Sequence, residues 1–280
     1  MKLFDNPHKK YLDHGHVVLL DYMGSDTDIE YAARMSYADG TRTVSDTKRL
    51  IDFLLRHEHS SPFEMAEFKF QIKMPIFVMR QVVRHRTANL NEVSLRYSVA
   101  RDECYVPDVS RYNTQSVTNK QCSDDSIIED WQEAKHIVDS ANTASMVAYK
   151  ELLELGLSRE VARGVLPVNG YTEVVWKIDL KNLMHFLKLR MHSHAQKEIQ
   201  WLAQAMYDLV KETGKFDLCL DAFNRYILYG SRMSKHELEL VRNLVTLVGG
   251  WDDGMQELLL KQQGKLSNRE IAEFRDKIGL

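Results

Sequence analysis

The sequence predicts an α+β fold in which a mainly antiparallel sheet packs with long helices and is followed by a helical C-terminal extension. Three features of the chain indicate this fold. Apolar and polar residues alternate strictly over residues 67–74, a strand-then-helix pattern starts at residue 171, and residues 216–280 have helical periodicity. Because no linker or low-complexity tract separates the parts, we expect residues 1–215 and the extension 216–280 to form one domain.

The first expected elements are a strand and two helices. Residues 15–21 contain the run His16-Val17-Val18-Leu19-Leu20, which predicts a short buried strand. Helical patterns follow over residues 27–36 and 46–56. The second helix has an expected apolar face of Leu50, Phe53, Leu54 and Leu55.

The alternating strand leads directly into a helix with cationic residues at its end. The apolar face of this strand consists of Phe68, Phe70, Ile72 and Met74. Pro75 stands where a helix can begin, because the first helical turn does not need the N–H that proline lacks. The helix is expected to end in a polar group of Gln81, Arg84, His85 and Arg86.

A polar segment and a long helix are expected in the middle of the chain. Residues 110–125 are rich in Ser, Thr, Asn and Gln and predict a loop or lid. The helix is expected over residues 126–155, with Asp124 and Asp125 at its start, where acidic residues suit the helix dipole.

A second strand-then-helix unit begins at Tyr171. Asp179 is the predicted N-cap of a helix that ends near Arg190. Three pairs have the spacing of capping boxes at the starts of later helices: Ser193/Gln196, Ser234/Glu237 and Ser267/Glu270.

Composition limits the classes of protein. The 280 residues are 44% hydrophobic and 28% charged, an ordinary globular balance, and no stretch is apolar for long enough to span a bilayer. The formal net charge of −3 argues against general electrostatic attraction to nucleic acid. Three cysteines without a C-x-x-C pair are typical of a reducing compartment, so we expect a cytoplasmic protein.

The densest group of candidate ligand side chains runs from Arg84 to Arg96. Arg84, His85 and Arg86 repel one another unless solvent or anions compensate their charge, and arginine forks suit phosphate or carboxylate. The Ser94 hydroxyl can complete such an anion cradle. The alternative interpretation is a solvated helix end, where cations suit the dipole.

Other motifs are weaker or absent. His57/His59 and His192/His194 suggest a metal, but spacing places no third ligand, so we predict no metal site. An arginine such as Arg190 at the end of an apolar helix is more often a snorkelling cap than a ligand. The chain has no G-x-G-x-x-G, Walker A, H-E-x-x-H or G-x-S-x-G motif, so any dinucleotide must be held without a Rossmann turn.

The segment from Gln81 to Tyr97, QVVRHRTANLNEVSLRY, resembles the signature of the flavin-dependent thymidylate synthases, in which RHR is followed after seven residues by Ser. Three more segments are similar to the family's in the same order: residues 59–64, HSSPFE; residues 163–167, RGVLP; and residues 189–196, LRMHSHAQ. The resemblance covers about residues 15–215 and leaves the extension unexplained.

This resemblance implies an enzyme that reductively methylates dUMP to dTMP with methylenetetrahydrofolate, using FAD as redox carrier and NADPH as reductant. It also implies a homotetramer whose active sites are shared between subunits. Residues 1–215 would then be the catalytic domain.

The resemblance also implies site residues. The dUMP site falls on Gln81, Arg84, Glu92, Ser94, Leu95, Arg96, Arg163 and Arg190. The FAD contacts fall on Ser61, Arg84, His85, Arg86, Glu92, Asp179, Lys181 and His185, of which the last three depart from the Asn/Arg/Asn pattern of some members. The expected catalytic residues are Arg190, similar to an arginine that contacts the uracil ring, and His59, similar to a histidine near the flavin and folate. Ser94 is expected to bind phosphate and not to act as a nucleophile, because no nearby base is evident.

Two other classes of protein compete with this interpretation. A nucleic-acid-binding protein could use residues 258–280 as a helix-turn-helix, although the net charge and the lack of a basic face count against it. A metal-dependent hydrolase could use the four histidines of the two pairs. No cysteine lies in the Pro-Cys-His context of the cysteine-dependent thymidylate synthases, which weakens that alternative.

Overall fold

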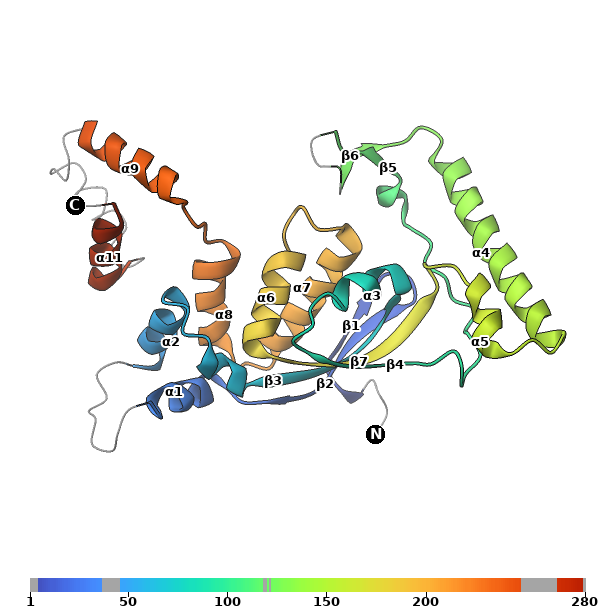
Figure 1. Cartoon of the computed structure of the whole chain (residues 1–280), viewed down its shortest axis with the longest axis horizontal. Helices are drawn as coiled ribbons and strands as arrows, with labels where there is room; N and C mark the ends of the chain where they lie inside the picture. The colour runs from blue at the N-terminus through green and yellow to red at the C-terminus, as the bar shows by residue number, and fades with distance from the viewer. Residues whose placement is uncertain (1–4, 37–45, 118–119, 121, 248–265, 279–280) are drawn as a thin grey trace. The chain divides into compact units, whose positions relative to one another are not determined.

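The computed structural model describes residues 5–36, 46–117, 120, 122–247 and 266–278 (Figure 1). Its contacts divide the chain into two compact units, Met1–Tyr229 and Gly230–Leu280. All residues predicted for the site belong to the first unit. Within the described ranges, no helix is long and apolar enough to cross a membrane.

The centre of the first unit is an antiparallel sheet with the strand order β1-β2-β3-β7-β4. Its strands are β1 (His8–Tyr11), β2 (Gly15–Met23), β3 (Glu67–Pro75), β7 (Tyr171–Asp179) and β4 (Asn89–Glu92). In the register of β3 and β7, Phe70 lies opposite Trp176. The predicted α+β class, the antiparallel sheet and the strands at residues 15, 67 and 171 are confirmed.

One face of this sheet carries the main core, because the alternating apolar residues of β3 and β7 all point to it. Phe68, Phe70 and Ile72 are fully buried, and Trp176 is 1% exposed. Burial of each such side chain contributes about 1.5–3 kcal/mol, so the alternation decides which face points inward. Three helices cover that face (Figure 1): α3 (Ile76–Val82), α6 (Leu180–Arg190) and α7 (Lys197–Glu212).

Three further helices pack against one another: α1 (Asp26–Arg34), α2 (Thr47–Arg56) and α8 (Asp217–Phe223). The two predicted N-terminal helices are confirmed. Because α8 buries Cys219 and Phe223 in the main core, the first compact unit extends past residue 215 to Tyr229.

The expected apolar face of α2 was incomplete. Its two buried side chains are Leu54, which was expected, and Ile51, which was not. The other expected members, Leu50, Phe53 and Leu55, are partly buried, and Leu50 and Leu55 pack against the main core. The difference arises because α2 contacts both α1 and α8, so the buried stripe is set by two neighbours.

We expected the polar segment over residues 110–125 to be a loop or lid, but part of it forms strands. A second sheet of two strands, β5 (Asn113–Gln115) and β6 (Ser123–Ile127), occupies part of it. Because β6 takes the residues where the long helix was expected to begin, α4 runs only from Trp131 to Glu154. Asp124 is therefore not at a helix start, and its carboxylate accepts from the Thr114 hydroxyl at 2.6 Å.

Two further expectations about helix ends need correction. α3 ends at Val82, so Arg84, His85 and Arg86 lie in the turn beyond it and not on the helix. Ser193 and Gln196 form no capping box, since Gln196 itself is the N-cap of α7 and makes no capping bond with its side chain. Its side chain has another partner, described below.

Three other capping predictions are confirmed. The Asp179 carboxylate accepts from the Asn182 backbone N–H at 2.9 Å and starts α6. In the second unit, Ser234/Glu237 begins α9 (Lys235–Leu247) and Ser267/Glu270 begins α11 (Asn268–Ile278), each with reciprocal bonds. Residues 258–265 of the alternative helix-turn-helix lie outside the described residues.

Candidate functional site

The end of α6 and the turn after α3 bring three predicted residues into contact. Arg190, the last residue of α6, donates from Nε to Nε2 of His85 at 3.0 Å. Its Nη2 donates to the backbone oxygen of Gln81 at 3.4 Å. The His85 ring lies edge-on to Phe186, with centroids 4.9 Å apart, and its centroid is 5.9 Å from that of His185.

The contact with Arg190 requires a neutral His85. Burial, together with the positive charges of Arg190 and His185, lowers the pKa of His85 to about 4. At neutral pH its Nε2 therefore carries a lone pair that accepts from Arg190, and the proton is on Nδ1. Burial also lowers the pKa of Arg190, but a guanidinium remains charged. The result is a half-buried cation in a fixed orientation, able to bind an anionic or carbonyl oxygen.

Gln81 is held by a network that the sequence did not reveal. Its Nε2 donates to Oε1 of Gln196 at 2.7 Å. Glu198, only 2% exposed, accepts from Nε of Arg111 at 2.7 Å and from the Tyr105 hydroxyl at 3.2 Å. An acidic residue in the first turn of a helix usually indicates a solvated partner of the dipole, so spacing carried no signal for this buried ion pair.

The expected phosphate ligands gather beyond β4. Ser94, Leu95 and Arg96 form a turn in which the Ser94 Oγ accepts from the Arg96 backbone N–H at 3.3 Å. Arg96 Nε lies 3.9 Å from Glu160 of α5 (Arg159–Ala162), and because both side chains are more than half exposed, the pair contributes little. Arg163 follows α5 directly and its side chain is exposed, so the cations on this surface remain available to an anion.

Glu92 lies at the end of β4. It is opposite Val174 of β7, and opposite residues of paired strands point to the same face, so the Glu92 side chain extends on the face that the helices cover. There it accepts from the Thr172 hydroxyl at 2.6 Å. Arg84 and Arg86 are exposed, and neither forms an ion pair with a residue of the described ranges.

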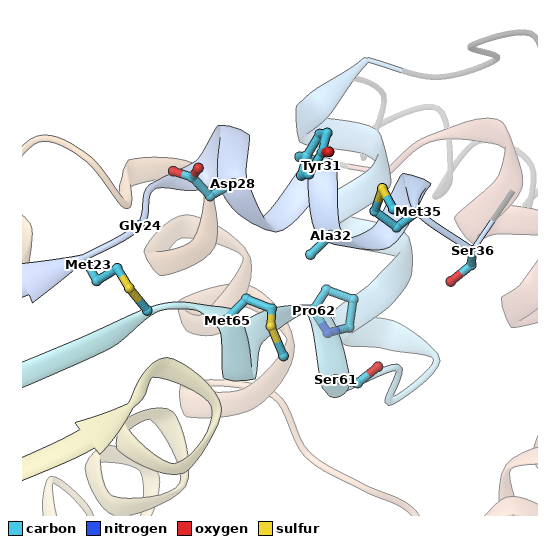
Figure 2. Close-up of a pocket in the computed structure, with 10 residues that line it drawn as sticks. All are labelled: Met23, Gly24, Asp28, Tyr31, Ala32, Met35, Ser36, Ser61, Pro62 and Met65. Atoms are coloured by element: carbon cyan, nitrogen blue, oxygen red, sulfur yellow. The ribbon is translucent and has the colours of Figure 1, made fainter. Parts of the chain in front are cut away.

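Ser61 opens the short helix η2 (Ser61–Met65) and lines a pocket with a volume of about 500 Å³. Figure 2 shows α1 on one side of this pocket and η2 on the other. The lining is largely apolar: Met23, Gly24, Asp28, Tyr31, Ala32, Met35, Ser36, Ser61, Pro62 and Met65. Sulfur and aromatic side chains around a cavity of this size suit a flat ring system.

The remaining predicted residues lie near η2 and the start of α6. His59 is exposed, and its ring centroid is 5.5 Å from that of Phe53. Lys181 lies 3.8 Å from Glu64 of η2, whereas the Asp179 carboxylate is used to cap α6. Because α6 has 11 residues, Lys181 and Arg190 are separated by roughly 14 Å along the helix.

The structure thus arranges the predicted residues in three groups. The Arg190 group comprises Gln81, His85 and Arg190. The Ser94 group comprises Ser94, Arg96 and Arg163. The η2 group comprises His59, Ser61 and Lys181. Among the described residues, no hydrogen bond or ion pair joins one group to another.

Neither histidine pair has a third ligand among the residues that the structure describes. The ring centroids are 6.4 Å apart in His57/His59 and 4.7 Å apart in His192/His194. Over the described part of the chain, no three His, Cys, Asp or Glu side chains come together in a way that could hold a metal ion.

Comparisons with known proteins agree with one another. A family model described as thymidylate synthase complementing protein matches residues 18–213. A flavin-dependent thymidylate synthase of Wolbachia pipientis wMel is 47% identical over 268 residues, which is 95% of this chain and 90% of that protein. One from Thermus thermophilus is 48% identical over 235 residues, 84% of this chain and 85% of that protein.

Solved structures show the same likeness. The UMP/dUMP methylase PolB from Streptomyces cacaoi, bound with 5-Br UMP, superposes with a TM-score of 0.70 at 32% identity, covering 79% of this chain and 99% of that one. Its structure bound with 5-Br dUMP gives a TM-score of 0.69 at 31% identity, covering 80% of this chain and 100% of that one.

Proposed function

The chain belongs to the family of flavin-dependent thymidylate synthases, and we propose from this that it converts dUMP to dTMP by reductive methylation. In this proposal methylenetetrahydrofolate donates the carbon, FAD is the redox carrier and NADPH is the reductant. The observation that supports it most is the Arg190 group, which presents a half-buried, oriented guanidinium beside Gln81.

Arg190 is the proposed electrophilic residue of the reaction. When the uracil ring of dUMP is activated, negative charge develops on N3 or O2. A guanidinium that is already oriented by His85, and partly shielded from water, stabilises such charge without having to reorganise. His59 is the second proposed catalytic residue, near the flavin and folate.

The residues of the chain fit FAD. Arg84 and Arg86 are exposed cations that match a pyrophosphate, and Ser61 lines a pocket whose apolar walls match a ring. The other proposed contacts are His85, Glu92, Asp179, Lys181 and His185. Of these, Asp179 acts through the start of α6, since its carboxylate is engaged by Asn182. When bound, FAD supplies hydride transfer.

The phosphate of dUMP is proposed to bind the Ser94 group. A hydroxyl and two guanidinium forks match the oxygens of a phosphate monoester. Glu160, the acidic neighbour of Arg96 within the described ranges, is too distant and too exposed to compete strongly. Gln81, Arg84, Glu92 and Leu95 complete the proposed dUMP site.

We propose a cytoplasmic homotetramer with active sites shared between subunits. In the described part of the chain no hydrogen bond or ion pair joins the three groups of residues, and in this proposal residues of a second copy complete each site. Large apolar side chains near the Ser94 group are exposed, including Tyr97 at 78% and Val161 at 56%. Apolar residues that remain exposed around an incomplete site are typical of an interface between subunits.

The absorption spectrum tests the flavin part of this proposal. Purified protein should be yellow, or become so after incubation with FAD, and should oxidise NADPH in response to dUMP. A folded preparation that neither retains nor takes up FAD would overturn the proposal.

A further inference from the structure

The side-chain amide of Gln81 has one of its two ends already committed. Its Nε2 donates to Gln196 Oε1 at 2.7 Å, and its backbone oxygen accepts from Arg190. A carboxamide has a donor end with two N–H bonds and an acceptor end. Because the donor end of Gln81 faces Gln196, the acceptor Oε1 is the end turned away from Gln196, where it can accept from a ligand. Which end faces the ligand therefore depends on which end of Gln196 faces Gln81.

A buried carboxylate, Glu198, follows Gln196 by two positions in the chain. Glu198 is 2% exposed and receives two bonds from Arg111, at 2.7 Å from Nε and 3.3 Å from Nη2. Burial alone would raise the pKa of Glu198, but Arg111, a backbone N–H and the Gln196 side chain lower it below its usual value, so the group is ionised. An ionised carboxylate only accepts, so it favours the NH₂ of Gln196 over its oxygen, which agrees with the geometry in which the Gln196 Oε1 accepts from Gln81.

We propose that Gln196 and Glu198 are positioning residues that fix the orientation of the Gln81 amide, so that Gln81 selects a nucleotide with a hydrogen-bond donor at this point. This inference rests on the proposed function. On dUMP the donor is either the ring N3–H or the 3′ hydroxyl of the sugar. Cytosine has an acceptor at ring position 3, and an acceptor facing the Gln81 oxygen would leave both unpaired.

The test uses FAD-loaded protein and three ligands: dUMP, dCMP and 2′,3′-dideoxyuridine monophosphate. Gln196→Leu removes the acceptor that orients Gln81, so its amide is free to turn over. Loss of one oriented hydrogen bond should weaken dUMP binding about tenfold. The ligand that lacks the relevant donor should lose little, so the preference for dUMP over it narrows.

Gln200→Leu is the matched control. Gln200 lies on the same helix, is similarly half-buried, and donates to the backbone oxygens of Ala195 and Ser193 without touching Gln81. It should leave all three affinities at wild-type values. If Gln196→Leu does not fold, as judged by its thermal melting, Gln196→Met keeps a shape closer to that of the original side chain and has the same predicted effect.

The outcomes separate this inference from the proposed function. If the affinity for dUMP falls towards that for dCMP in Gln196→Leu, the inference is supported with N3–H as the donor. If it falls instead towards the affinity for the dideoxynucleotide, the inference is supported with the 3′ hydroxyl as the donor. If wild-type protein binds dUMP but neither ratio changes in the folded Gln196 variant, the inference is wrong. Wild-type protein that fails to bind dUMP instead overturns the proposed function.

Discussion

Arg190 Nε and His85 Nε2 lie 3.0 Å apart, although the two residues are separated by 105 positions in the chain. This contact exists only while His85 is neutral, since a protonated imidazole offers no lone pair to a guanidinium. One half-buried side chain thus sets the orientation of another, and the proposed chemistry depends on that orientation.

Arg190→Ala should abolish most dTMP formation while leaving the fold intact. Removing one oriented donor from a site of developing negative charge typically lowers kcat by about 10²–10³-fold. Lys188→Ala is the matched control, because Lys188 is a basic residue in the same last turn of α6. Turnover, FAD content and circular dichroism are measured for both variants, and near-normal turnover of Arg190→Ala would remove this residue from the mechanism.

His85 should make stability depend on pH in a defined direction. Its pKa falls from 6.5 to about 4 on folding, so between these values the unfolded chain binds a proton that the folded chain does not. The contribution of His85 to the free energy of unfolding is therefore fully present above about pH 6.5 and is lost as the pH falls towards about 4. His85→Gln keeps an acceptor for Arg190 but cannot titrate, so its urea-unfolding free energy should decline less over this range. Equal declines in variant and wild type would contradict the prediction.

Arg96→Ala should weaken the binding of dUMP but not of deoxyuridine. A charge-assisted hydrogen bond contributes about 1.5–3 kcal/mol, which corresponds to a KM for dUMP that is raised about tenfold to about hundredfold. Arg101→Ala is the control, because Arg101 is an exposed arginine of the same region whose nearest carboxylate, on Glu173, is 3.7 Å away. If Arg96→Ala weakens both ligands equally, Arg96 does not recognise the phosphate.

Mixing two impaired variants, assayed at a dUMP concentration far below the raised KM of Arg96→Ala, tests whether sites are shared between subunits. Arg190→Ala retains the Ser94 group, and Arg96→Ala retains the Arg190 group. When the two are co-expressed, some sites of mixed oligomers should contain both intact groups and recover dTMP formation. Mixed oligomers that form but stay inactive would mean that each site is built from one chain.

Elements whose cause is local could be predicted from the sequence. The alternation of β3 follows from burial of every second residue, and Asp179 starts α6 through a bond to a residue three positions away. β4 was not predicted, because four exposed polar and apolar residues have no periodicity and form a strand only by pairing with β7. In the same way, β6 replaced the expected helix start by pairing with β5.

The site could be predicted only as a set of residues. The resemblance named Gln81, His85 and Arg190, but no pattern in the sequence shows that they touch, because their contact depends on how α3 and α6 pack. Gln196 shows the reverse case. Its spacing from Ser193 predicted a capping box, but its side chain accepts a hydrogen bond from Gln81, 115 positions away.

The most direct test of the proposed function is the fate of the methylene carbon. FAD-loaded protein is incubated with dUMP, NADPH and methylenetetrahydrofolate labelled in its methylene group, and the nucleotides are separated. We predict labelled dTMP, formed only when FAD and all three substrates are present. Folded, FAD-loaded protein that leaves dUMP unchanged under these conditions would contradict the account.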